Sequence, residues 1–153
     1  MQQDHASAEA SLPVAAVQVT LAYRPERAAA TLLELRSPSS AVLLDAGPDY
    51  GTADFWRTSP VLPNGWALLG ELDKFIGISR QRIARITTGS ETGVLKVFVV
   101  GAPGELVHMT AASKSGGASN SHAKWQLCVI DVRVGSEGTA EFMLPGSGGC
   151  NKS

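Results

Sequence analysis

The side chains best suited to chemistry lie in one short segment of the sequence, where aromatic rings stand among carboxylates and an amide. Four of the aromatic residues fall between positions 50 and 66. Sugar rings present apolar C–H faces that stack on aromatic side chains, and their hydroxyls hydrogen-bond to carboxylates and amides. The predicted ligand-binding residues are Tyr50, Phe55, Trp56, Trp66, Asp49, Asp54 and Asn64. In the alternative interpretation, Phe55 and Trp56 pack beneath their loop and close one end of the fold.

The other reactive side chains match no catalytic or metal-binding motif. The histidines, His5, His108 and His122, are scattered, and no Cys-x-x-Cys pair accompanies them, as a local zinc motif would require. The polar stretch 114–122 contains serine and histidine but no Gly-x-Ser-x-Gly elbow, so we interpret it as a flexible linker. The aspartates from Asp45 to Asp54 do not have the spacing of an EF-hand calcium loop. We therefore predict no catalytic residue, no metal and no cofactor.

Two other functions stay open. In one, the chain is a small hydrolase or transferase whose site is assembled only in three dimensions, from Asp49, Glu71 or Asp73 with His108. In the other, the chain is a structural protein-interaction domain, which would present a flat apolar patch instead of a cleft.

A cluster of basic residues lies between positions 74 and 85. Lys74, Arg80, Arg82 and Arg85, together with Phe75, could contact a phosphate and a base of a nucleic acid. The whole chain has 13 Lys and Arg against 14 Asp and Glu, and its formal net charge is −1. Because proteins that bind nucleic acid by electrostatic attraction carry a basic excess, we predict no nucleic-acid partner and interpret the cluster as a solvated strand face.

The elements that must position these residues are short β-strands. Val17, Val19, Leu21 and Tyr23 follow the two-residue period of a half-buried strand. Further strands are expected within 31–36, 41–45, 66–78, 79–86, 94–100, 106–111, 125–134 and 139–144. The turn residues at 102–105 and 135–138 are expected to join the last four strands into two hairpins. The sequence therefore predicts an all-β fold, an antiparallel β-sandwich of the Ig-like or jelly-roll type, with at most a short helix near residues 25–35.

The length and composition fit one globular domain with two polar ends. The chain has 153 residues, of which 44% are hydrophobic. We expect a flexible N-terminal arm over 1–12, a single β-sandwich domain over 13–145 and a flexible Gly/Ser-rich tail over 146–153. No apolar run reaches the roughly 18 residues that a membrane-spanning helix needs, so we predict no membrane partner.

The compartment is not determined by the sequence. The first ten residues lack the basic and apolar regions of a signal peptide, so the chain is either intracellular or part of a larger secreted protein. The two cysteines leave the same question open. Cys128 lies in an apolar run and Cys150 in the tail, and they could form a disulfide or remain free thiols.

The C-terminal half resembles the accessory β-sandwich modules that follow secreted enzymes, through its turn sequences 101–105 and 134–142. Together with the aromatic segment, this resemblance implies a non-catalytic module. We expect it to bind a carbohydrate or to pack against a neighbouring enzyme domain.

Overall fold

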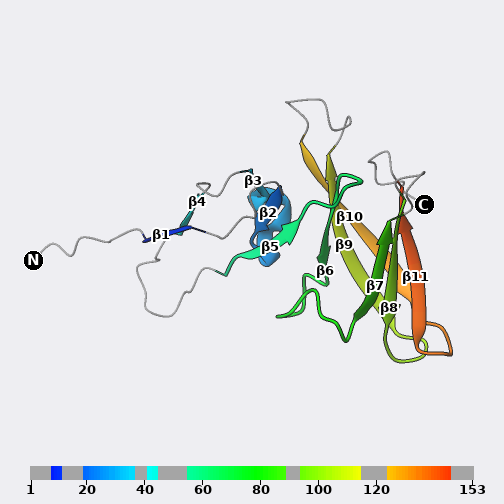
Figure 1. Ribbon diagram of the computed structural model, residues 1–153. Helices are drawn as coiled ribbons and strands as arrows, with labels where there is room; N and C mark the ends of the chain where they lie inside the picture. Colours follow the sequence, from blue (N-terminus) through cyan, green and yellow to red (C-terminus); the bar gives the residue numbers. More distant parts are fainter. Residues whose placement is uncertain are drawn as a thin grey trace, which may run out of the picture. The chain divides into compact units, whose positions relative to one another are not determined.

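The computed structural model describes residues 8–11, 19–36, 41–44, 55–88, 94–114 and 124–145. The chain divides into two compact units, Met1–Pro60 and Val61–Ser153. Figure 1 labels the strands of each unit. Within the described residues, every pair of neighbouring strands is antiparallel. The predicted all-β antiparallel fold class is therefore confirmed. No helix in the described part of the chain is long and apolar enough to cross a membrane.

The first unit contains two small sheets. One pairs β1 (Ala8–Ser11) with β4 (Ala41–Leu44), and the other has the order β3-β2-β5, with β2 at Thr20–Tyr23, β3 at Leu33–Leu35 and β5 at Arg57–Pro60. A 3-10 turn, η1 (Pro25–Arg27), and the single-turn helix α1 (Ala28–Thr31) connect β2 to β3. This confirms the short helix expected near residues 25–35. It begins at Pro25, whose fixed backbone angle suits a first helical position.

The second unit contains two three-stranded sheets. Their strands are β6 (Trp66–Gly70), β7 (Ile83–Thr88), β8 (Leu95–Val100), β9 (Leu106–Lys114), β10 (Trp125–Arg133) and β11 (Thr139–Leu144). The sheet orders are β10-β9-β6 and β11-β8-β7. Strand β8 shows why this sequence forms half-buried strands, because Leu95, Val97 and Val99 are buried while the alternate residues face away from the core.

One hydrophobic cluster joins the two sheets of the second unit. It includes Val97 and Val99 from β8, Val107 and Met109 from β9, and Phe142 from β11. Each sheet therefore buries one face against the same core. The turns lie at the ends of the strands that contribute to this core.

The two predicted hairpins are wrong. Strand β8 does not pair with β9, and β10 does not pair with β11; instead β8 pairs with β7 and β11, and β9 pairs with β6 and β10. The turns at 101–105 and 134–138 thus lead from one sheet to the other (Figure 1). They are hydrogen-bonded to each other, with Gly101 N donating to Gly138 O at 3.0 Å and Val134 N to Glu105 O at 2.8 Å. Local turn chemistry specified the reversal of the chain but not the partner of each strand.

The segment 66–78 also differs from its prediction. Only β6 forms there, and the expected second strand is replaced by turns and bends over 72–78. Gly70 has a φ of +78°, and a Cβ at this position would overlap the carbonyl oxygen of Gly77. Because the chain folds back so closely on Gly70, residues 71–78 form a compact loop instead of a strand.

Cys128 is disulfide-bonded, which decides between the two alternatives left open for this residue. It belongs to the shared core and lies on β10. Cys150 lies outside the described residues.

Candidate functional site

The loop between β6 and β7, residues 71–82, carries the most distinctive group of side chains in the second unit. Its start is held by a hydrogen bond from the Glu71 amide to the Gly77 carbonyl at 2.9 Å. Between these two anchors, Phe75 is 80% exposed and Ile76 is 64% exposed. The loop therefore presents an apolar surface to solvent from a backbone that its own hydrogen bonds fix.

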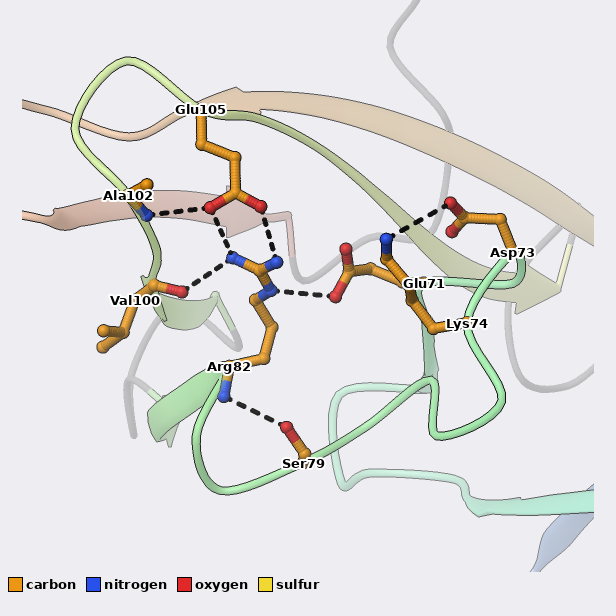
Figure 2. A network of polar contacts seen from close by, with 8 residues as sticks. All are labelled: Glu71, Asp73, Lys74, Ser79, Arg82, Val100, Ala102 and Glu105. Carbon is orange, nitrogen blue, oxygen red and sulfur yellow. Dashed lines mark hydrogen bonds and ion pairs between the residues drawn. The ribbon is translucent and has the colours of Figure 1, made fainter.

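Arg82 lies at the centre of a polar network at the end of this loop (Figure 2). Its Nε donates to Oε2 of Glu71 at 2.8 Å. Its Nη1 and Nη2 donate to the two carboxylate oxygens of Glu105 at 3.1 and 2.6 Å. Nη1 also donates to the Val100 carbonyl at 2.9 Å, so all three guanidinium nitrogens are engaged. Such two-point pairing of a guanidinium with a carboxylate fixes the orientation of both groups.

The network connects elements that are distant in the sequence. Glu71 follows β6, Arg82 precedes β7, and Glu105 lies in the turn between β8 and β9. Glu105 also accepts a hydrogen bond from the Ala102 amide at 2.8 Å, which ties its carboxylate to its own turn. The side chains of Arg82 and Glu71 are only 18% and 8% exposed, so this contact is largely shielded from water.

The network joins one guanidinium to two carboxylates, and the pKa values of Arg82 and Glu105 are shifted by this pairing. Hydrogen bonds from Arg82 and from the Ala102 amide lower the pKa of Glu105 to about 2. Conversely, the hydrogen bonds to Glu105 raise the pKa of Arg82 above its usual value. Both groups are therefore charged at neutral pH.

Gly101 leaves the space that the network occupies. A Cβ at this position would lie 2.5 Å from Oε2 of Glu105 and 2.6 Å from Nη1 of Arg82. Any larger residue must displace one of these charged groups. Glycine therefore suits this position through the close approach of the network and not through a turn conformation.

An open cavity of about 390 Å³ lies beside the network. Its polar lining includes Glu71, Ser79, Gln81, Arg82 and Glu105. Lys74 and Ile76 of the loop and the strand end at Val100 and Gly101 complete it. Its volume lies within the range of small-ligand sites, but it is open to solvent and its lining is mainly polar.

Of the residues predicted to bind a ligand, Trp66 lies in the core. It is 1% exposed, and its Nε1 donates to the Pro145 carbonyl at 2.6 Å. A ring that is covered on both faces has no surface on which a sugar can stack. Trp66 starts β6, all five residues of which are buried, and the strand carries the ring inside with it.

The other predicted residues are divided between the two units or lie outside the described residues. Phe55 is 42% exposed, and the Arg57 guanidinium lies 5.6 Å from its ring centre. Trp56 is half-buried, and its Nε1 has no hydrogen-bond partner among the described residues. In the second unit, Oδ1 of Asn64 accepts a hydrogen bond from the Trp66 amide at 3.3 Å. The remaining predicted residues, Asp49, Tyr50 and Asp54, lie outside the described residues.

The basic cluster is divided among different partners. Arg82 belongs to the network, and the Arg85 guanidinium lies 4.2 Å from the ring centre of Phe98. Lys74 forms an ion pair with Asp73 at 3.9 Å, which Figure 2 also shows. The interpretation as a solvated strand face therefore holds only for Arg85, because Lys74, Arg80 and Arg82 precede β7 and Arg82 is largely shielded from water.

The groups named for a catalytic alternative are not brought together. Glu71 contacts Arg82, and Asp73 lies beside Lys74. His108 instead forms a contact of 2.7 Å with Asp131, its register partner on β10, and both side chains are exposed. Neither of these two residues lines the cavity. Asp49 lies outside the described residues, and within the described ranges no group of three His, Cys, Asp or Glu side chains is placed to hold a metal ion.

Comparison of the chain with protein-family models, curated proteins and solved structures finds no match. The interpretation of the site therefore depends on its geometry. Sequence reasoning did single out Arg82, but it missed Glu71 and Glu105 as its partners. The missing signal was the position of Glu105 directly after a Gly-Ala-Pro-Gly turn, where a carboxylate can bond to its own turn amides.

Proposed function

We propose that this chain is a non-catalytic β-sandwich module, of the Ig-like or jelly-roll type, that binds carbohydrate. The sandwich assignment is supported by the second unit, in which two three-stranded antiparallel sheets share one hydrophobic cluster. Sheets that face each other across a core of alternating inward side chains are the basis of that architecture.

The observation that carries the binding function is the cavity beside Arg82. Its polar lining is held in place before any ligand arrives, because Arg82, Glu71 and Glu105 fix one another. Groups that are already ordered lose little conformational entropy when a ligand binds. The mixture of carboxylate, amide and hydroxyl groups suits a ligand that both donates and accepts hydrogen bonds, as sugar hydroxyls do.

The same network is poorly suited to catalysis. A general acid or base works best when its pKa lies near the working pH. The pKa of Glu105, about 2, is far below that range, and the carboxylate is already occupied by Arg82. We therefore favour binding over hydrolysis for this site.

Six of the seven predicted residues of the aromatic segment remain in the proposal. Phe55 and Trp56, with Asp49, Tyr50, Asp54 and Asn64, remain predicted ligand contacts. Trp66 is assigned a packing role, because its ring is buried.

Affinity electrophoresis and calorimetry of the full chain against neutral polysaccharides test this function. We expect saturable binding of at least one of cellulose, xylan, mannan, β-glucan or chitin oligosaccharides. A parallel assay for new reducing ends is expected to show none. The proposal is wrong if no polysaccharide binds, and the hydrolase alternative gains if reducing ends accumulate and His108→Ala abolishes them.

A further inference from the structure

We infer that the cavity beside Arg82 recognises the acetamido group of an N-acetylated sugar. In this assignment Gln81 forms hydrogen bonds with the amide of the sugar, and Ile76 contacts its methyl group. The inference rests on the proposed carbohydrate-binding function and names the class of sugar that the cavity takes.

The network around Arg82 leaves little of its own hydrogen-bonding capacity to a ligand. Of the five N–H groups of a guanidinium, one is used by Glu71, two by Glu105 and one by the Val100 carbonyl. Both carboxylate oxygens of Glu105 are engaged, and one of them also accepts from the Ala102 amide. The network therefore holds the wall of the cavity in place, and a ligand must find most of its partners among the other lining residues.

Two neutral polar residues of the lining supply these partners. Gln81 lines the cavity and is exposed, and its side-chain amide both donates and accepts. The Ser79 hydroxyl oxygen accepts from the Arg82 amide at 3.2 Å, and its own hydrogen is able to donate. An acetamido group presents one N–H donor and one carbonyl acceptor. It can therefore pair with both ends of the Gln81 amide, while Ser79 offers a second donor to the carbonyl.

The apolar part of the lining is small and contains no aromatic ring among the described residues. Ile76 is its most exposed apolar side chain, at 64%, followed by Val100 at 36%, whereas the neighbouring Phe75 does not line the cavity. Stacking of a whole sugar ring needs a flat aromatic surface, but a methyl group needs only an aliphatic side chain. The acetyl methyl group is therefore the part of a sugar that suits Ile76.

The backbone restrains both contact residues. Ile76 directly precedes Gly77, whose carbonyl accepts from the Glu71 amide at 2.9 Å. Gln81 lies in a turn in which the Ser79 carbonyl accepts from the next amide after Gln81 at 3.1 Å. Because hydrogen bonds hold the chain beside each residue, less conformational entropy is lost when a ligand binds.

Calorimetry of the full chain against three β-1,4-linked hexamers tests the inference. The hexamers of N-acetylglucosamine, glucose and glucosamine differ only in the group at C2. We expect the acetylated hexamer to bind about tenfold more tightly than the glucose hexamer, as hydrogen bonds and one buried methyl group would give. The glucosamine hexamer tests the role of charge, because the network joins two carboxylates to one guanidinium.

Two variants test the residues, each with a matched control. Gln81→Ala is expected to lower the preference for the acetylated hexamer about fivefold, and Ile76→Ala about threefold. Gln126→Ala and Val129→Ala change exposed residues of β10 that do not line the cavity, and both should keep the preference of the wild type. Since Gln81 and Ile76 are exposed, an unchanged thermal midpoint separates a lost contact from lost folding.

Four results would overturn the inference. If the acetylated hexamer binds no more tightly than the glucose hexamer, or if only other polysaccharides bind, the cavity assignment is wrong and the carbohydrate function stands. If Gln81→Ala and Ile76→Ala both keep the preference, the acetamido group is recognised elsewhere. If the glucosamine hexamer binds most tightly, with an affinity that falls as salt is added, the carboxylates select a cation. If the wild type binds no polysaccharide, the proposed function fails, and this inference fails with it.

Discussion

The aromatic segment around residues 55–66 and the loop 71–82 both place rings and polar side chains within a few positions, but the fold uses them in opposite ways. Trp66 enters a strand whose residues are all buried, so its ring becomes part of the core. Phe75 lies in a turn between two strands, and its ring stays in solvent. The element that carries a residue, more than the residues beside it in sequence, decides whether its ring packs or is presented.

The polar groups show the same contrast. Asn64 orders the turn that leads into Trp66, through a single hydrogen bond within that turn. Arg82, by comparison, holds carboxylates from two other segments. The first region thus has polar contacts that serve local structure, and the second has contacts that connect distant parts of the unit. Four changes test this comparison.

The largest effect is expected from Trp66→Ala. Loss of a buried indole leaves a cavity and an unpaired Pro145 carbonyl, and we expect the free energy of unfolding to fall by about 4 kcal/mol. Phe55→Ala, at a partly exposed ring, should change it by less than about 0.5 kcal/mol. Urea denaturation measures both. Similar losses for the two variants would contradict the assignment of Trp66 to the core.

Arg82→Ala is expected to have the next largest effect. It leaves Glu71 largely buried without its guanidinium partner, which should cost about 3 kcal/mol of unfolding free energy. Arg85→Ala is the matched control, since Arg85 is exposed and contacts one aromatic ring, and it should cost about 0.5 kcal/mol. The same denaturation measurements apply. Equal and small losses would show that the network adds nothing to stability.

Gly101→Ala tests the space around the network without removing a charge. The added methyl group would meet Glu105 and Arg82 at under 3 Å, and we expect a loss of about 2 kcal/mol. Gly135→Ala meets only the Thr139 carbonyl oxygen, at 3.2 Å, and is expected to cost less. Thermal unfolding of the two variants decides the point. A larger loss for Gly135→Ala would mean that the side chains of Glu105 and Arg82 move aside at little cost in free energy.

The smallest effect is expected from acid. The pKa of Glu105 is about 2 in the folded state, below its ordinary value of 4.5. Its contribution to stability is therefore complete above pH 4.5 and is lost as the pH falls toward 2. In denaturation curves across this window, Glu105→Gln should show a weaker dependence on pH than the wild type. Identical slopes would place the acid sensitivity in other carboxylates.

Much of the fold could be predicted from the sequence, because the alternation of apolar and polar residues along a strand indicates directly which side chains are buried. Strand β11 has the predicted bounds, and β8 begins one residue later than expected. The pairing could not be predicted in this way. The turns at 101–105 and 134–138 have the composition of hairpin turns, yet they connect different sheets, and strands of both sheets contribute to one hydrophobic cluster.

The candidate site was less accessible to sequence reasoning. Arg82 and Phe75 were singled out as parts of a basic cluster, but Glu71 and Glu105 are separated from each other by two strands. No local spacing links them. Only the tertiary fold brings the three charged groups together. The same fold buries Trp66, whose residue type and sequence neighbours had indicated a binding role.

The sheet-crossing turns also have a consequence for how the second unit forms during synthesis. Strand β8 pairs with β11, and Leu95 is the register partner of Leu144. The sheet that contains β8 is therefore complete only after the residues up to Leu144 have been synthesised. Contacts between residues so far apart slow folding and make it depend on the whole segment. A nascent chain that stops before Thr139 lacks Phe142 and Leu144 from the core, so the unit gains its stability only once its last strand has left the ribosome.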